Sequence, residues 1–342
     1  MSSSLRYLGG RLAWAIVVIA GVATLAFVVS ELLPGDPARM VLGPQASPAD
    51  VARAREIYGF DRPLPVRFAR FVGRLVHRGP AIVPSARGRG DHRSCAAIAP
   101  GVHLDLGYSV NSRRPVVDLL ADRAPRTLQL AFAALGLQLL FGVSGGMLAA
   151  ARRGTRWDEL VMSLSLVGLS VPTFLIGLAL QYVFAYKLRV LPYDGYGGSP
   201  AEHLRALALP ALTLGLLGSS IYARLTRAEL RSLLEADYVR TARAKGASGA
   251  RALFVHAMRN ALVPLSTVMA LDFAVLLSGA TITERLFRWP GVGQLTVDAV
   301  LNRDGPVIFG AVLWSAAGVV GAMLALDLAY VLLDPRLRRA GR

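Results

Sequence analysis

The chain has 342 residues, of which 54% are apolar and only 18% are charged, with a mean hydropathy of +0.47. The apolar residues occur in blocks of about twenty, the length that crosses a hydrocarbon core of ~30 Å. This distribution excludes soluble, disordered, collagen-like and disulfide-rich proteins, the last also because Cys95 is the single cysteine. The net charge is +16. The basic residues lie between the apolar blocks. Contact with anionic membrane lipid and the positive-inside rule therefore explain the positive charge, which does not indicate nucleic-acid binding.

The apolar blocks predict six membrane-spanning helices, each of which closes its backbone hydrogen bonds within its own segment. The first block is longer than the core of a secretory signal and leads into Glu31 and Pro34 rather than a small-residue cleavage site. We therefore expect a retained anchor. The six predicted spans are residues 11–33, 126–151, 160–186, 206–223, 261–283 and 308–333.

Two of these spans carry glycine pairs at helical spacing: Gly142 with Gly146 in the second, and Gly318 with Gly321 in the sixth. Small residues let helices approach closely in a membrane, where water offers no hydrophobic driving force between them. We interpret the pairs as packing positions rather than as a pore lining.

Basic residues predict the orientation and the division of the chain. They are concentrated in the loops after the second and fourth spans and in the two tails, which places both termini in the cytoplasm. The predicted parts are residues 1–34 (tail and first helix), 35–125 (a large extracytoplasmic loop), 126–333 (a five-helix core) and 334–342 (a cytoplasmic tail). The core includes a long basic cytoplasmic loop, residues 224–260.

The chain lacks the sequence of a nucleotide-binding loop. Such a loop ends in Gly-Lys-Ser/Thr, whereas Lys187 is followed by Leu188 and Lys245 by Gly246, and these are the only two lysines. If ATP drives this protein, another chain binds it. An intramembrane enzyme is not indicated either, because the sequence has no His-Glu-x-x-His motif and no paired nucleophile and base.

Two carboxylates, Asp272 and Asp327, fall inside predicted spans. Ionisable groups are costly within a membrane and often serve function. One hypothesis is therefore a secondary transporter that an ion gradient drives through Asp272 and Asp327. The alternative is that each carboxylate is paired within the helix bundle or lies near a helix end.

The loop 224–260 carries a predicted helix, Leu230 to Gly246, in which Gly246 is the stop signal. Tyr238, Ala242 and Lys245 share one face, and small residues lie nearby. This pattern suits a short helix that docks in the groove of a partner. A basic amphipathic helix on solvent or lipid has the same composition, so both interpretations stay open here.

The order of residues in this loop resembles a known family. Asp237-Tyr238-Val239-Arg240-Thr241-Ala242-Arg243-Ala244-Lys245-Gly246, followed by His256-Ala257-Met258-Arg259-Asn260, is similar to the cytoplasmic loop of ABC importer permeases of the dipeptide/oligopeptide/nickel type. Thr241, Ala242 and Gly246 occupy the place of that superfamily's Glu-Ala-Ala…Gly motif, with Arg240 at its first position instead of Glu.

The resemblance extends along most of the chain, in the family's order. It is carried by Leu33-Pro34-Gly35-Asp36-Pro37, Tyr58-Gly59-Phe60-Asp61-Arg62-Pro63, Asp105-Leu106-Gly107-Tyr108-Ser109, Arg126-Thr127-Leu128, Leu169-Ser170-Val171-Pro172-Thr173-Phe174, Leu209-Pro210-Ala211-Leu212-Thr213-Leu214, Thr283-Glu284, Trp289-Pro290-Gly291-Val292-Gly293 and Asp327-Leu328-Ala329-Tyr330-Val331-Leu332-Leu333-Asp334-Pro335-Arg336.

The resemblance implies an all-α membrane protein with six transmembrane helices, the ABC importer type I permease fold and a large first extracytoplasmic loop. It implies a non-catalytic subunit of the bacterial inner membrane, with no cofactor in this chain and ATP and Mg on the partners. Those partners are a second permease subunit, two cytoplasmic P-loop ATPase subunits and an extracytoplasmic solute-binding protein. The solute, whether a dipeptide, an oligopeptide, a metal chelate or another compound, stays open.

The resemblance also implies three groups of site residues, with no catalytic residue and no metal ligand. The first couples the permease to the ATPase and comprises Asp237, Tyr238, Arg240, Thr241, Ala242, Lys245 and Gly246. The second lines the translocation path and comprises Pro172, Gln181, Asp272 and Ser278, although Pro172 is equally explained as a helix kink. The third shapes an outer hairpin and comprises Pro290, Gly291 and Gly293.

One segment departs from the family: residues from about 79 to 103 are rich in Gly, Pro and Arg and match none of its motifs. We expect a loop insertion there. Its polar residues (Asp91, His92, Cys95 and His103, with His77 just before) are of types that bind zinc, but their spacing fits no known zinc pattern. A passive outer loop is the simpler interpretation.

Overall fold

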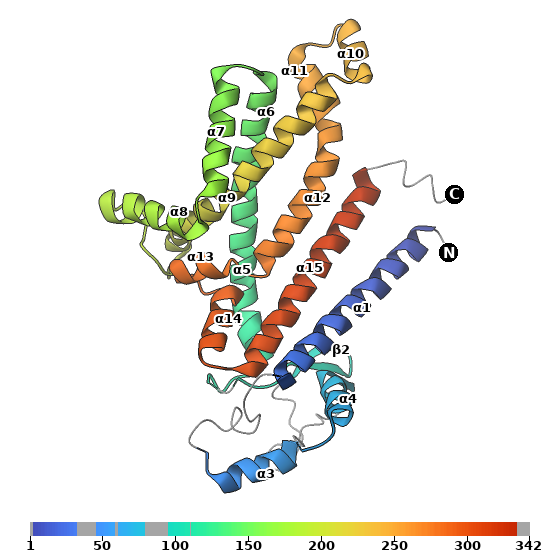
Figure 1. Ribbon diagram of the computed structural model, residues 1–342, viewed down its shortest axis with the longest axis vertical. Helices are drawn as coiled ribbons and strands as arrows, with labels where there is room; N and C mark the ends of the chain where they lie inside the picture. The colour runs from blue at the N-terminus through green and yellow to red at the C-terminus, as the bar shows by residue number, and fades with distance from the viewer. Residues whose placement is uncertain (1–2, 33–45, 59–60, 79–94, 110, 334–342) are drawn as a thin grey trace. The chain divides into compact units, whose positions relative to one another are not determined.

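The computed structural model describes residues 3–32, 46–58, 61–78, 95–109 and 111–333 (Figure 1). Its contacts divide the chain into two compact units. The first unit contains residues 1–11, 126–290 and 318–342, and the second contains residues 12–125 and 291–317. Each unit is described by itself below.

Most described residues are helical, as the sequence predicts. The helices are α1 (Ser3–Leu32), α3 (Pro48–Tyr58), α4 (Leu64–Leu75), α5 (Val116–Gln138), α6 (Ser144–Ala151), α7 (Arg156–Ser170), α8 (Thr173–Leu180), α9 (Pro200–Leu234), α10 (Asp237–Ala244), α11 (Gly249–Arg251), α12 (Met258–Leu277), α13 (Thr281–Leu286), α14 (Val292–Leu301) and α15 (Gly305–Leu333). Three π-helical turns continue them: η2 (Leu139–Val143) joins α5 to α6, η3 (Gln181–Lys187) extends α8, and η4 (Ala252–Ala257) joins α11 to α12.

Five of these helical runs are long and apolar enough to cross a membrane among the described residues: Gly9–Val28, Val116–Ala151, Pro200–Leu234, Gly249–Leu277 and Gly305–Leu328. A sixth crossing exists only if α7 and the α8–η3 helix count as one span, because they are bent by 105° at their junction. The sequence predicts a span over residues 160–186 with a helix kink as one interpretation of Pro172, and the structure has a sharp bend at that proline rather than a continuous helix. Val171 is extended before Pro172, which begins α8 as its N-terminal cap, because the proline ring disfavours a helical residue before it.

In the first unit, α9 packs against α6 and α7 at close range (Figure 1). Gly142 and Gly146 face the α9 backbone so closely that a Cβ on either would lie 2.6 Å from a backbone oxygen, of Ser219 and Ala223 respectively. Both glycines therefore act as the packing positions that the sequence predicts. Gly318 is a milder case, since a Cβ there would lie 3.2 Å from the Cβ of Leu277.

An ion pair fixes α7 against α9 in the same unit. Arg227 donates from Nε and Nη2 to the two carboxylate oxygens of Asp158, the second at 2.8 Å. The backbone N–H of Gly154 donates to the same carboxylate. A bidentate pair of this kind fixes the orientation of both side chains as well as their distance.

The second unit holds a small antiparallel sheet in the order β1-β3-β2, made of β1 (Val76–Arg78), β2 (Cys95–Ala99) and β3 (Val102–Asp105). The expected loop over residues 79–103 is thus corrected for its described part, 95–103, because those residues pair as strands. Residues 79–94 lie outside the described residues. The core of this unit comes from the start of α5, from α14 and from the start of α15.

The buried carboxylate of Asp304 connects two distant segments of the second unit. Asp304 accepts a hydrogen bond from the hydroxyl of Ser109 at 2.6 Å and another from the backbone N–H of Asn111. Asp105 accepts one from the backbone N–H of Gly107, whose φ is +86°. The motif Asp105-Leu106-Gly107-Tyr108-Ser109 is therefore a turn that attaches the first loop to the segment before α15.

Candidate functional site

The loop 224–260 is almost entirely helical. The helix α9 runs on to Leu234, eleven residues beyond the predicted end of the fourth span at residue 223. The predicted helix from Leu230 to Gly246 is not continuous, because Ala236 adopts an extended conformation (ψ 146°) and begins α10. Two helices of different direction therefore replace one.

The end of α10 is defined by hydrogen bonds around Gly246. The N–H of Ala247 donates to the carbonyl of Ala242 at 3.1 Å, and the N–H of Gly246 donates to that of Arg243 at 2.9 Å. This pair of bonds is a Schellman motif, which needs a left-handed residue after the helix, and Gly246 has a φ of +91°. The structure thus confirms Gly246 as the stop signal.

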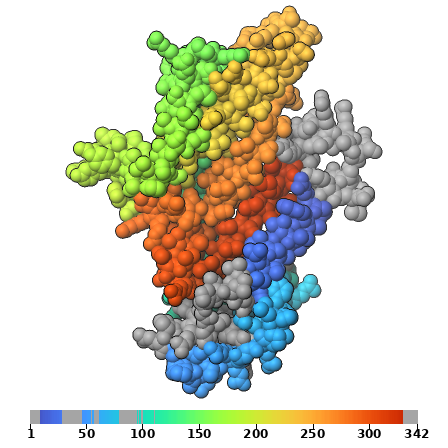
Figure 2. All heavy atoms as spheres, viewed as in Figure 1, coloured from blue at the N-terminus to red at the C-terminus, as the bar shows by residue number. Residues whose placement is uncertain are grey.

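The helix α10 is held by few contacts and leaves most of its surface open. Only Val239 is buried, with no exposed surface, while Asp237, Arg240, Thr241 and Lys245 are exposed. The hydroxyl of Tyr238 accepts a hydrogen bond from the side-chain amide of Asn260 at 2.8 Å, which connects α10 to the start of α12. Figure 2 shows the segment of α10 standing out at one end of the α6–α7–α9 group. The helix α10 is thus a short helix with one buried anchor and an otherwise largely exposed surface.

The four predicted path residues have different surroundings. Pro172 stands at the 105° bend. Gln181 is 1% exposed and donates its side-chain amide to the carbonyl of Tyr193, which gives it a structural contact within the chain rather than an open surface. Ser278 ends α12 and donates to the carbonyl of Ala274. Of the four, only Asp272 presents a partly exposed charged group.

Asp272 lies within α12 and contacts α9. The hydroxyl of Tyr222, a residue that is 1% exposed, donates to its carboxylate at 3.4 Å. Asp327 differs, because the guanidinium of Arg11 lies 2.9 Å from its carboxylate and supplies a countercharge. The pairing that the sequence left as an alternative for Asp327 is therefore present in the structure.

Three sequence motifs that lie far apart in the chain meet in the first unit. The hydroxyl of Thr127 donates to the fully buried carboxylate of Glu284, and the indole N–H of Trp289 donates to the carbonyl of Arg126 at 2.9 Å. Sequence reasoning noted each motif but assigned no contact between them, since no local pattern specifies a bond across more than 150 positions. These bonds attach α13 to the middle of α5.

The predicted outer hairpin consists of short helices. Pro290 follows Trp289 in the turn after α13, Gly291 is the N-terminal cap of α14, and Gly293 is buried within α14. The hairpin's role in partner binding stays a prediction.

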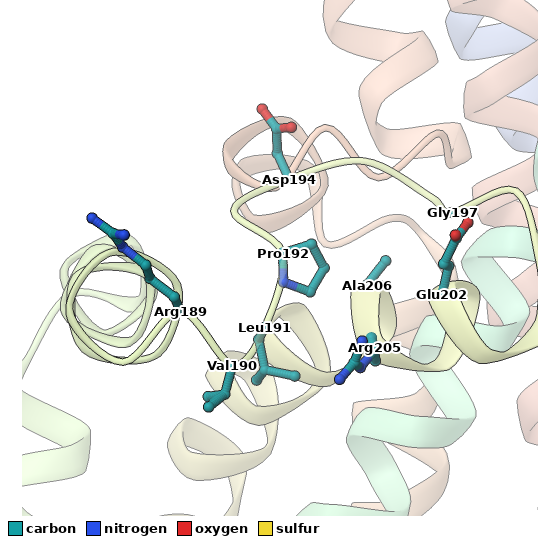
Figure 3. Close-up of a pocket in the computed structure, with 9 residues that line it drawn as sticks. All are labelled: Arg189, Val190, Leu191, Pro192, Asp194, Gly197, Glu202, Arg205 and Ala206. Carbon is teal, nitrogen blue, oxygen red and sulfur yellow. The ribbon is translucent and has the colours of Figure 1, made fainter.

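A pocket of about 430 Å³ lies where the chain passes from η3 to α9 (Figure 3). Its acidic residues already have partners: Glu202 accepts from the N–H groups of Gly198 and Ser199, and Asp194 pairs with Arg288 at 3.3 Å. Figure 3 shows Arg205 on α9 and Arg189 at the end of η3, on different elements of the pocket wall. The nine lining residues are Arg189, Val190, Leu191, Pro192, Asp194, Gly197, Glu202, Arg205 and Ala206.

The zinc hypothesis gains no support from the described residues. His77 and His103 face each other across β1 and β3 with ring centroids 5.6 Å apart, and the Cys95 sulfur lies 3.6 Å from Nε2 of His77. No group of three or more His, Cys, Asp or Glu side chains that could hold a metal ion occurs in the part of the chain that the structure describes. Asp91 and His92 lie outside that part.

Comparison with known proteins agrees with the fold and the motifs. The family model for binding-protein-dependent transport system inner membrane components matches residues 142–339, and the model of its N-terminal part matches residues 4–131. The chain belongs to this family. It is the permease subunit of an ABC importer, as the sequence predicts, and neither the family models nor the relatives support an ion-gradient-driven transporter.

Two curated relatives are similar over nearly their whole length. A probable peptide ABC transporter permease of Sinorhizobium fredii is 38% identical over 335 residues, which is 97% of this chain and 99% of the relative. A glutathione transport system permease of Salmonella paratyphi A is 37% identical over 335 residues, which is 98% of this chain and 99% of the relative.

Solved structures show the same fold at lower identity. A chain of the MetNI methionine ABC transporter, in an inward-facing conformation, aligns with a TM-score of 0.54 at 15% identity and covers 64% of this chain and 98% of its own length. This likeness concerns the fold alone, and it confirms the predicted all-α membrane permease.

Proposed function

We propose that this chain and a second permease subunit form the translocation path of an ATP-driven importer for peptides or related small solutes. Two separate ATPase subunits would bind ATP and Mg, and an extracytoplasmic binding protein would deliver the solute. The printed functions of the relatives, peptide and glutathione transport, support this class of solute. The chain itself would hydrolyse nothing.

The observation that carries the proposal is the geometry of α10. The helix has one buried residue, Val239, and a Schellman end at Gly246, so it is a stable unit with a free face. That face carries Tyr238, Ala242 and Lys245. We infer that it sits in a cleft of an ATPase subunit, and that nucleotide-driven closure moves it between two states.

The same helix has a direct connection to the membrane part. The Tyr238–Asn260 hydrogen bond joins α10 to the start of α12, and α9 leads into α10 through two residues. Motion of α10 would therefore reach α9 and α12, the two helices that carry Tyr222 and Asp272. This is the physical route by which ATP hydrolysis in a partner would change access to the path.

The outer side would meet the binding protein. The 35-residue helix α9 is about 52 Å long at 1.5 Å per residue, so its two ends lie on opposite sides of a hydrocarbon core of ~30 Å. With α10 in the cytoplasm, the pocket between η3 and α9 faces outward. Its arginines, Arg189 and Arg205, would then be available to a binding protein or the second permease. We propose the same partners, separately, for the outer hairpin that Pro290, Gly291 and Gly293 shape.

Substitution of Ala242 by Trp tests the coupling role. A bulky side chain on this face would keep α10 out of the cleft, so we expect ATP-dependent uptake to be lost while the protein remains in the membrane. The matched control is Ala250→Trp, since Ala250 is exposed in the same loop but lies outside α10. Normal uptake by the Ala242→Trp protein would contradict the coupling assignment.

Purification of the tagged chain in mild detergent tests the assembly. We expect two P-loop ATPases and a second six-span permease to accompany it. Recovery of a homo-oligomer without an ATPase, from membranes in which the Ala250→Trp protein still supports ATP-dependent uptake, would overturn the proposal.

A further inference from the structure

Asp272 is an ionisable residue within a helix that is apolar enough to span the membrane. It lies in α12 about 21 Å from Met258, and Tyr222 lies in α9 about 18 Å from Leu234, at 1.5 Å per residue. Asp272 and Tyr222 both belong to helical runs that are apolar enough to cross a membrane, Gly249–Leu277 and Pro200–Leu234 respectively. A carboxylate in such a run is unfavourable unless it faces water or a compensating cation.

The described part of the chain supplies no cationic partner for this carboxylate. The hydroxyl of Tyr222 is the one side-chain partner of Asp272 among the described residues, and it is a neutral donor. Asp327, Asp158 and Asp194 each have an arginine within 3.3 Å. Glu284 and Asp304 accept from neutral donors, as Asp272 does, but both are buried, whereas Asp272 is partly exposed. Asp272 is therefore prepared to receive a positive charge from elsewhere.

The carboxylate is also reachable. Asp272 is partly exposed, and Val275, three residues further on the same side of α12, is 68% exposed. Tyr222, by contrast, is fixed in the core of the first unit. The phenol thus holds the carboxylate in one orientation at the edge of an uncovered helix face. A face that bears a carboxylate cannot be directed at lipid, so it borders a water-filled path or another chain.

We propose that Asp272, oriented by Tyr222, binds the ammonium group of the transported solute within the membrane-spanning part of the chain. This inference rests on the proposed function, because that function supplies the path and a solute with a free amino group. The carboxylate accepts charge-assisted hydrogen bonds from the ammonium group, and the Tyr222 hydroxyl satisfies one of the remaining lone pairs. The site therefore favours solutes with a free amino terminus over the same solutes with a blocked one.

The test uses the complete importer with its binding protein in proteoliposomes and two solutes, a peptide with a free amino terminus and its N-acetylated form. Each variant is compared with the wild type for each solute, so the selectivity of the binding protein cancels. Asp272→Asn should lower uptake of the free-amine peptide about tenfold or more, the value of one hydrogen bond to a charged group, and leave the acetylated peptide within about twofold. Asp272→Glu should keep most of the wild-type preference for the free-amine peptide over the acetylated one, and Tyr222→Phe should lower this preference partially.

Other outcomes overturn the inference. An equal loss of uptake for both solutes would mean that Asp272 has a structural role or pairs with a cation of the second permease. If the second permease no longer copurifies with the Asp272→Asn protein, the pairing with that subunit is the explanation. No loss for either solute would remove the site. Absence of ATP-dependent uptake in the wild type would instead contradict the proposed function itself.

A second measurement applies if the wild type carries only the free-amine peptide. The chain has a single cysteine, so Cys95→Ser gives a background in which Asp272→Cys is the only thiol. A membrane-impermeant cationic thiosulfonate should modify this cysteine. Ala270→Cys, at a buried position of the same helix, is the control that should stay unmodified. An unmodified Asp272→Cys protein would show that no water reaches the position and would overturn the inference.

Discussion

At the scale of single residues, conformation and charge decide which positions tolerate change. Gly246 has open space around it, since a Cβ added there would meet nothing within 4 Å. Its requirement for glycine is therefore conformational and comes from its φ of +91° alone.

Gly246→Ala is accordingly expected to loosen the end of α10 without a clash. An L-residue in the left-handed region costs roughly 1–2 kcal/mol, which corresponds to about a 5- to 30-fold loss of protection of the α10 amides in hydrogen exchange. Gly249→Ala is the matched control, because Gly249 also has open space but no positive φ. Equal protection in the two variants would show that the Schellman motif does not hold α10.

The same scale marks what the sequence could not predict about the site. The sequence shows that Asp272 lies in an apolar segment, and it is also clear from the sequence that a carboxylate in a membrane-spanning segment is energetically unfavourable. Its partner Tyr222 lies 50 positions away on another helix, and only the packing of α9 against α12 brings the two together. Gln181 is a second example: its place in a span is visible in the sequence, but the hydrogen bond from its side-chain amide to the Tyr193 carbonyl is visible only in the fold.

At the scale of elements, glycines set the distance between helices. Gly146 and its neighbour Gly145 have the same residue type and adjacent positions but different surroundings. A Cβ on Gly146 would lie 2.6 Å from the Ala223 carbonyl oxygen, whereas one on Gly145 would meet Val161 at an ordinary 3.5 Å. Backbone atoms of α9 cannot move aside as a flexible side chain can.

Gly146→Ala should therefore push α6 away from α9 and lower the stability of the bundle by about 1–3 kcal/mol, the usual range for overpacking. Gly145→Ala should be close to neutral or slightly stabilising, since alanine favours the helix. Thermal unfolding of both variants in detergent measures the difference. Equal unfolding temperatures would mean that the α6–α9 contact does not limit stability.

The elements also show how far hydropathy predicts a fold. Long apolar blocks predicted five of the spans, although the second begins at Val116 rather than near residue 126 and α9 continues past residue 223 to Leu234. The bend at Pro172 is invisible to a hydropathy window, which averages across it, but the proline itself is the local signal that allows a helix kink to be predicted there. The three short strands have no comparable signal: each has three to five residues, and their pairing connects segments on both sides of residues 79–94.

At the scale of the whole molecule, the open question is which side of the membrane each loop faces. Positive charge is concentrated around α10 and in the tails, which predicts a cytoplasmic position for both termini and for the loop 224–260. The segment between η3 and α9 belongs to the opposite end of α9 from α10, and α9 is too long for both ends to lie on one side. The two loops should therefore differ in access to a reagent that does not cross membranes.

Single cysteines in the Cys95→Ser background test this prediction. Lys187→Cys and Ala250→Cys place a thiol at exposed positions of the two loops. An impermeant maleimide should label Lys187→Cys from outside intact spheroplasts and Ala250→Cys only in inverted vesicles, and detergent should expose both equally. The charge rule applies to short loops, so the basic residues of the large first loop are not counted in it. The labelling measures the orientation directly and therefore decides whether α10 is available to cytoplasmic ATPases. Labelling of Ala250→Cys from outside would reverse the orientation and, with it, the assignment of α10 as the helix that receives the force of ATP hydrolysis.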